Sequence, residues 1–467
     1  MSIASFSKPV PAGLRPTGCP VSLSPEPASR GLVRRCFLRT LGVAAMLALT
    51  AGSTLRASAD DWPQWRGPSR TGVSKEKGWT LAWPKEGPPS LWRTSVGMGY
   101  SSFAVADGRV FTLGNTTNTD TLFCFDAASG SSLWSHSYAC PLDESTVEGG
   151  PLSTPTVDGS RVYTVSRRGH VFCLEADTGK VVWQKQLTDE LSVTRPELGF
   201  ASSPVVEGGA LVLNAGGAGT VLDKATGKPL WNPAKGEAGY TTPVVYDSAS
   251  GRAATFLTAH GVVSVLLQDG KELFRLPWND PHRLNVGDLI FTTPTSLFVS
   301  GSGRGSTLLQ TTEGAVVEYW SGTNAAFGFS SSVLVNGHVF GFHGHPDDPN
   351  RDLRCVDADT GQVRWRQPAY GLGTLFVADG NLVVLTERGA LWVGEATAVG
   401  FKPKARAQVL GGRCWTVPVL ANGRLYCRNS RGMVVCLDFS GKGSSTTASS
   451  DPAKAPIVQV ERPEAAK

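Results

Sequence analysis

Short apolar segments alternate with glycine-containing turns along most of this 467-residue chain, between residues 100 and 441. Within each segment apolar and polar side chains alternate, which is the period of a β-strand with one buried face. Turns such as Asp158-Gly159 and Asn422-Gly423 join the strands, because these residues adopt the positive φ values of a tight hairpin. The pattern predicts an all-β chain built from hairpins.

One four-stranded unit occurs eight times, and its clearest copy runs from Ser153 to Trp183. The glycine that closes the last turn of this copy, Gly179, has counterparts at intervals of 43 to 49 residues. The counterparts at these intervals are Gly130, Gly227, Gly270, Gly314 and Gly361, and Gly441 follows 80 residues later, or two steps of 40. Repeats of this length with several short strands are typical of a β-propeller. The sequence therefore predicts an eight-bladed β-propeller over residues 60–441.

The two ends of the repeat region predict how the ring closes. The eighth copy stops at Gly441 without its fourth strand, whereas residues 89–94 form a strand that precedes the first copy and belongs to no blade. Pairing these two strands would hide both open sheet edges. We therefore expect a ring closed by an N-terminal strand.

A large aromatic residue recurs on the fourth strand of most copies. It is Trp134, Trp183, Trp231 and Trp365 four residues after the closing glycine, with Phe274 and Trp320 in the fourth and fifth copies. One aromatic at a fixed place in each blade is expected to pack neighbouring blades together. We interpret this tryptophan repeat as structural and not as chemical.

The first 59 residues lie outside the repeat and have the features of an export signal. Arg34 and Arg35 form a twin-arginine pair, an apolar run covers residues 41–51, and Ala57-Ser58-Ala59 offers a cleavage site. A membrane anchor is the alternative, but eleven apolar residues are too few to span about 30 Å of hydrocarbon. We expect twin-arginine export, with the Sec route as the alternative, and a periplasmic or secreted mature chain without a transmembrane span.

Removal of this signal changes the charge of the protein. Residues 1–59 carry seven Lys or Arg and one acidic residue, so the net charge of +5 falls to about −1 in the mature chain. No basic surface for nucleic acid is therefore expected. Residues 442–467 are rich in Ser, Pro, Ala and Lys with almost no apolar pattern, which predicts a disordered tail.

Seven cysteines remain after the signal, and four of them occupy one position of the repeat: Cys124, Cys173, Cys355 and Cys436. Equivalent positions of different blades are too far apart for a disulfide, so we expect buried thiols that pack as small apolar groups. One pair differs. If Arg431 and Gly432 form a two-residue turn, Cys427 lies directly opposite Cys436, and a disulfide between them is an open possibility.

The blade segment Asp357-Ala358-Asp359-Thr360-Gly361 with Trp365 resembles the PQQ-type (pyrroloquinoline quinone-type) propeller repeat. This repeat occurs in quinoprotein dehydrogenases, in the outer-membrane assembly factor BamB and in exported bacterial proteins, and the last group is similar in residues 62–68 (WPQWRGP) and 395–397. The resemblance implies a quinoprotein-like propeller fold, whereas the repeat itself is a scaffold and does not determine function.

The resemblance also implies a test for cofactor chemistry. Quinoprotein alcohol dehydrogenases use a vicinal cysteine pair, a calcium ion and an aspartate base, whereas this sequence has no Cys-Cys dipeptide and no long insertions that would cover a cofactor. The absence of a cysteine at the cleavage site also argues against a lipoprotein anchor of the BamB kind. No resident cofactor is expected, and PQQ or a divalent metal is the alternative to be tested.

Two sets of residues could nevertheless carry chemistry. His343, His345 and Asp347 could bind a divalent metal, although the same residue types are ordinary in a polar hairpin loop. Hydroxyl residues also open most copies, and they either surround a polar channel or are simply small where eight strands converge. These stretches are 100–102, 153–154, 202–203, 240–242, 291–293, 329–331 and 415–416.

Three functions follow from these observations. The first is a non-enzymatic, exported scaffold that binds protein or cell-envelope partners across one face of the ring. The second is a PQQ- or metal-dependent oxidoreductase that uses the channel. The third is a carbohydrate-binding propeller that uses exposed aromatic residues such as Trp62, Trp65 and Trp83.

Overall fold

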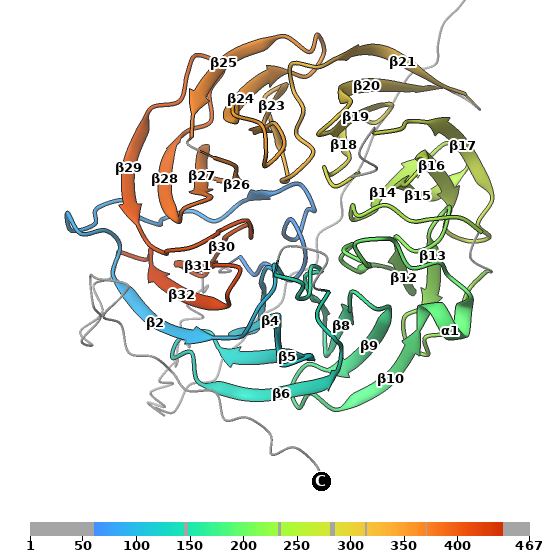
Figure 1. The fold of residues 1–467 in the computed structure, drawn as a ribbon, viewed down its shortest axis with the longest axis horizontal. Helices are drawn as coiled ribbons and strands as arrows, with labels where there is room; N and C mark the ends of the chain where they lie inside the picture. Colours follow the sequence, from blue (N-terminus) through green and yellow to red (C-terminus); the bar gives the residue numbers. More distant parts are fainter. Residues whose placement is uncertain are drawn as a thin grey trace, which may run out of the picture. The chain divides into compact units, whose positions relative to one another are not determined.

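The computed structural model describes residues 60–143, 148–231, 235–280, 285–312, 315–369 and 371–441. The expected export signal (1–59) and the expected disordered tail (442–467) lie outside the described residues. The described residues form eight β-sheets that follow one another around a ring, as Figure 1 shows. The eight-bladed β-propeller predicted from the repeat is confirmed.

The blades have the following bounds. Blade 1 is β3 (Ala104–Ala106), β4 (Arg109–Thr116), β5 (Thr119–Asp126) and β6 (Ser132–Ala139); blade 2 is β7 (Thr156–Asp158), β8 (Arg161–Val165), β9 (His170–Glu175) and β10 (Val181–Gln186), followed by the short helix α1 (Leu187–Leu191). Blade 3 is β11 (Val205–Glu207), β12 (Ala210–Leu213) and β13 (Thr220–Asp223); blade 4 is β14 (Val244–Ser248), β15 (Gly251–Thr258), β16 (Gly261–Leu266) and β17 (Glu272–Pro277).

Blade 5 is β18 (Ile290–Thr293), β19 (Ser296–Gly301), β20 (Gly305–Thr312) and β21 (Ala315–Gly322); blade 6 is β22 (Val333–Val335), β23 (His338–His343), β24 (Asp352–Asp357) and β25 (Val363–Pro368). Blade 7 is β26 (Gly373–Ala378), β27 (Asn381–Thr386), β28 (Ala390–Glu395) and β29 (Pro403–Gln408), joined by β1 (Val73–Ser74); blade 8 is β30 (Val419–Ala421), β31 (Arg424–Arg428) and β32 (Met433–Asp438), completed by β2 (Ser90–Ser95).

The ring closes through its N-terminal strand. β2 pairs antiparallel with β32, so that Trp92 lies opposite Cys436, and the sheet order of blade 8 is β2-β32-β31-β30. Figure 1 shows β2, in blue, along the outer edge of β32, in red. The two open edges therefore cover each other, as the ends of the repeat predicted.

The repeated tryptophans pack each blade on the next one. A Cβ atom on Gly179 would come within 2.5 Å of the Trp134 ring, and the Trp134 indole N–H donates to the Ala176 carbonyl at 3.0 Å. The same pair of contacts joins Trp92 to Gly130, Trp183 to Gly227, Trp231 to Gly270 and Trp320 to Gly361. The structural interpretation of the tryptophan repeat is confirmed.

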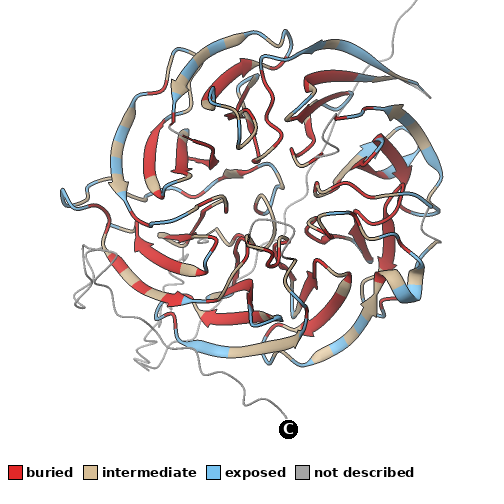
Figure 2. Ribbon diagram, in the orientation of Figure 1, coloured by how far each residue is buried: buried red, intermediate tan, exposed pale blue. Residues whose placement is uncertain are grey.

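Burial follows the order of the strands within each blade. The inner three strands are mostly buried, whereas outer strands such as β6, β10 and β21 are half-buried or exposed, as Figure 2 shows. Blade 3 departs from the pattern, because Pro229 lacks the N–H that a fourth strand would donate and makes only a single bridge to Leu222. None of the described helices is long and apolar enough to cross a membrane.

The described cysteines are all buried and free. Cys124, Cys173 and Cys355 are therefore the buried thiols that the repeat predicted. The predicted opposition of Cys427 and Cys436 is wrong, because Cys427 lies opposite Val435 and Cys436 lies opposite Tyr426. The hairpin loop is one residue longer than a two-residue turn, which shifts the register by one position and places the two thiols on opposite faces of the sheet.

Candidate functional site

The segment that precedes β2 crosses the axis of the ring and closes one end of the central channel. Residues 61–76, named the plug here, make hydrogen bonds to every blade except blade 4. Most of their partners lie at the far ends of the innermost strands, beside the turns to the second strands; examples are Val157, Glu207, Val377 and Asn422. Asp288 and Ser332, which bind Arg66, instead precede the innermost strands β18 and β22. Figure 1 shows this segment, in blue, passing through the middle of the ring.

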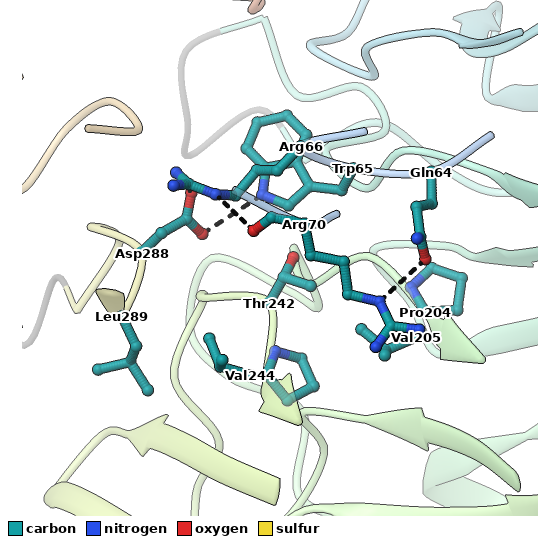
Figure 3. A pocket seen from close by; sticks show the side chains of 11 residues that line it. Gln64, Trp65, Arg66, Arg70, Pro204, Val205, Thr242, Val244, Asp288 and Leu289 are labelled. Atoms are coloured by element: carbon teal, nitrogen blue, oxygen red, sulfur yellow. Dashed lines mark hydrogen bonds and ion pairs between the residues drawn. The ribbon is translucent and has the colours of Figure 1, made fainter. Parts of the chain in front are cut away.

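A buried ion pair holds the plug on the axis. Asp288 accepts hydrogen bonds from the Arg66 guanidinium at 3.0 Å, from the Trp65 indole N–H at 3.3 Å and from the Ser331 hydroxyl at 2.6 Å. The Arg66 and Asp288 side chains are only 8% and 5% exposed. Figure 3 shows Trp65 and Arg66 converging on Asp288, with Arg70 directed toward blade 3 beside Gln64. Arg70 forms a second ion pair there with Glu207 at 2.9 Å.

A cavity of about 400 Å³ lies next to the plug on the axis of the ring and is lined by residues of every blade. Most of these residues precede the innermost strands, so the cavity opens at the end of the channel opposite the plug. Its aromatic residues are Trp65, Tyr100, Tyr240, Phe329 and Trp415, and its hydroxyl residues are Ser203, Thr242, Ser330, Ser331, Thr374 and Thr416. Because Trp65 forms its floor, the cavity is blind.

Aromatic rings of three blades form part of the cavity wall. Trp415 stacks on Tyr100 with their centroids 6.0 Å apart, and Phe329 meets Trp415 edge-on at 5.3 Å. The Arg413 guanidinium lies 4.7 Å from the centre of the Trp415 ring. Glu148 accepts hydrogen bonds from the Tyr100 hydroxyl and from Arg413, so this part of the wall is held in one arrangement. Burial, together with Glu148, raises the pKa of Tyr100, which keeps its hydroxyl protonated.

Both charged side chains that line the cavity already have counter-charges. Asp288 is paired with Arg66, and Arg167 lies 3.6 Å from Asp143. Arg167 also donates to the Leu198 carbonyl at 2.6 Å, and burial lowers the pKa of its guanidinium. The cavity therefore presents no unpaired charge among its described residues.

Two donors in the cavity wall have no hydrogen-bond partner among the described residues: the Ser330 hydroxyl and the Trp415 indole N–H. Buried polar groups of native proteins are nearly always paired with protein or water. Both atoms are buried within the wall and are not exposed to the cavity, so they do not identify a contact with a bound molecule.

Five of the seven hydroxyl stretches predicted from the sequence contribute residues to this cavity, whereas 153–154 and 291–293 do not. The predicted stretch 291–293 is wrong for blade 5, since Val286 and Asp288 line the cavity while Phe291 packs on Tyr246 at 4.7 Å. The two interpretations of the hydroxyls are also not exclusive, because small residues fit the converging strands and some hydroxyls face the cavity.

The aromatic residues suggested for carbohydrate binding at the surface are not exposed. Trp62 is buried and packs on Phe376, and Trp83 packs on Phe439. Trp65 is half-buried at the cavity floor. The suggestion is wrong for Trp62, whose indole is buried, whereas Trp83 is half-buried against Phe439 and stays a prediction. No sequence signal distinguished their role from that of Trp65.

The candidate metal ligands lie on the loop after β23. His345 approaches Asp347 at 3.4 Å, whereas the Nδ1 of His343 accepts the Ala326 N–H at 3.0 Å. Burial lowers the pKa of His343 to about 4, so its neutral ring carries a proton on Nε2 and has no free lone pair for a metal. The described residues contain no group of three His, Cys, Asp or Glu that could hold a metal. Metal binding at His343, His345 and Asp347 stays a prediction, and it requires this loop to rearrange.

Comparison with known proteins places the fold. A family model described as outer membrane protein assembly factor BamB matches residues 118–345, whereas the comparison with curated protein sequences gives no match. BamB from Moraxella catarrhalis is similar with a TM-score of 0.52 and 14% identity, over 75% of this chain and 98% of that one. The quinohemoprotein alcohol dehydrogenase from Comamonas testosteroni is similar with a TM-score of 0.60 and 14% identity, over 83% of this chain and 82% of that one.

These solved structures have different names and functions, and at such identities they establish the shared fold alone. A computationally designed protein, Ika8, is also similar, with a TM-score of 0.52 and 12% identity over 75% of this chain and 99% of that one. The repeat, the closed ring of eight blades and the family-model match agree with one another. The chain is an eight-bladed β-propeller whose repeat resembles the PQQ type and whose fold is similar to those of BamB and of a quinohemoprotein alcohol dehydrogenase.

Proposed function

We propose that this propeller is an exported, non-enzymatic scaffold that binds a protein or another cell-envelope component at the face on which the axial cavity opens. The blind cavity with its aromatic wall is the observation that supports the proposal. A volume of about 400 Å³ lies within the range of about 300–1,000 Å³ that ligand sites usually have. The rigid ring presents this cavity to whatever approaches the face.

The cavity residues do not fit a PQQ cofactor with its calcium ion. A vicinal cysteine pair is missing from the sequence, and none of the residues that line the cavity is a cysteine. Asp288 already accepts three hydrogen bonds, one of them from the Arg66 guanidinium, and is not free to act as a metal ligand or a base. The donor set therefore disfavours the oxidoreductase alternative.

The lining hydroxyls also lack the arrangement of an activated nucleophile. Ser331 donates to Asp288, but the Arg66 guanidinium and the Trp65 indole N–H already occupy that carboxylate. No histidine belongs to the described lining of the cavity. The geometry is that of a binding site and not of a hydrolase.

Site-specific photo-cross-linking tests the proposal. A photoreactive phenylalanine analogue at Phe329, on the cavity wall, is expected to form an adduct when the mature chain from Asp60 is incubated with cell-envelope extract. The same analogue at Leu133, which is 49% exposed on the outer strand β6, serves as the control. Equal adducts from both positions, or adducts from Leu133 alone, would overturn the proposal.

A further inference from the structure

Two rings of the axial cavity are held in place and yet have no ring partner of their own. The Trp65 indole N–H donates to Asp288 at 3.3 Å, and the Tyr240 hydroxyl accepts the Leu198 N–H at 3.3 Å. In the part of the chain that the structure describes, neither ring packs against another aromatic ring. The rings of Tyr100, Phe329 and Trp415, in contrast, pack against one another. Trp65 at the floor and Tyr240 in the wall are therefore the surfaces available to a ligand.

The polar groups around these rings restrict the ligand further. Burial raises the pKa of Tyr240, so its hydroxyl stays protonated and keeps a proton to donate. An acceptor oxygen on the ligand would satisfy this hydroxyl.

The charge of the cavity wall and the closed end of the cavity restrict the ligand further. Both charged lining residues are already in ion pairs, so a net charge on the ligand would meet no free counter-charge among the described residues. The plug blocks the far end of the channel, so a polymer cannot thread through the cavity. Only a small molecule, or the end of a chain, can enter.

From these features we infer that the cavity binds a neutral carbohydrate, as a free sugar or as the terminal sugar of a glycan. A sugar ring offers an apolar C–H face to an aromatic ring and hydroxyl oxygens to surrounding donors. The inference rests on the proposed scaffold function and names the chemistry of its ligand. The aromatic site lies on the axis of the ring, and not on the surface tryptophans that the sequence suggested.

Titration calorimetry on the mature chain from Asp60 tests the inference with four probes. N-acetylglucosamine and cellobiose are neutral sugars, glucuronate is a charged sugar, and p-cresol is an aromatic molecule without a sugar ring. We expect at least one neutral sugar to bind, with glucuronate and p-cresol weaker by about tenfold or more.

Three variants separate the site from the fold. Tyr240→Ala removes a stacking surface and is expected to weaken sugar binding by about tenfold. Tyr319→Ala removes a tyrosine that is 63% exposed on the outer strand β21 and is expected to leave binding unchanged. Ser330→Ala removes a buried hydroxyl that is not exposed to the cavity, so the fold is kept and binding changes less than it does in Tyr240→Ala.

Each outcome decides one question. Equal effects of Tyr240→Ala and Tyr319→Ala, or tighter binding of p-cresol than of any neutral sugar, would overturn the carbohydrate inference. If no probe binds while cross-linking at Phe329 persists, the ligand class is wrong and the scaffold proposal stands. If cross-linking fails as well, both are wrong.

Discussion

Replacement of Asp288 by alanine tests whether a buried ion pair holds the plug in the ring. An exposed pair would contribute only about 0–1 kcal/mol to the free energy of unfolding. The side chains of Arg66 and Asp288 are 8% and 5% exposed, so loss of the carboxylate leaves the guanidinium buried without its counter-charge. Such losses are typically about 3–5 kcal/mol. Arg66 keeps the Ser332 carbonyl as an acceptor at 2.8 Å, so we expect the lower end, about 3 kcal/mol.

Urea unfolding of the chain from Asp60, followed by tryptophan fluorescence and circular dichroism, measures this loss. Asp359→Ala is the matched control, because that aspartate is exposed and carries no ion pair among the described residues. The double variant Arg66→Met with Asp288→Leu removes both charges and is expected to regain at least half of the loss, since an apolar pair of similar volume is often tolerated. A loss below about 1 kcal/mol from Asp288→Ala, or single losses that simply add in the double variant, would refute the reasoning.

Three further predictions concern the ring. Gly179→Ala places a methyl group 2.5 Å from the Trp134 ring and should lower the free energy of unfolding, measured by thermal unfolding, by about 2–3 kcal/mol. Gly159→Ala, with open space around it, should lower it by about 1 kcal/mol. Equal losses would show that the Trp134 contact does not determine the effect. A reductant should leave the melting temperature unchanged, because the described cysteines are free; a drop would reveal a disulfide. The hydrogen bond from Ser129 lowers the pKa of Asp126, so Asp126→Ala should cost about 1 kcal/mol at pH 7. This cost should vanish as pH falls below the unfolded value of 3.8 and the carboxyl of the folded protein takes up its proton; a cost that persists at low pH would contradict it.

The fold could be predicted because its determinants are local and repeated. Each blade carries its own turn residues, its own strand alternation and its own aromatic residue, so eight weak signals support one another. The closing strand followed from a missing element at one end and an extra element at the other. Even the aspartate turn was predictable, since Asp357 accepts the amide hydrogens of Asp359 and Thr360 within five residues of sequence.

The candidate site could not be predicted in the same way, because long-range contacts build it. Asp288 and Arg66 are separated by 222 positions, and nothing near either residue marks it as a partner of the other. The register of the last hairpin failed for a different reason. One additional loop residue reverses the face of every side chain that follows, and turn residues alone do not determine loop length.

The residues that each blade places nearest the axis of the ring distinguish the candidate site from the rest of the fold. Packing of the ring requires small residues where the innermost strands converge, and Ser, Thr and Ala meet that need in most blades. It does not require the large rings of Tyr100, Tyr240, Phe329 and Trp415, which stand just before those strands in only some of the blades. Tyr100, Phe329 and Trp415 pack on one another, whereas Tyr240 has no ring partner among the described residues, so ring packing does not explain its place in the wall. Together with the plug, which converts the channel into a cavity with one entrance, this asymmetry is the strongest argument that the axis binds a ligand.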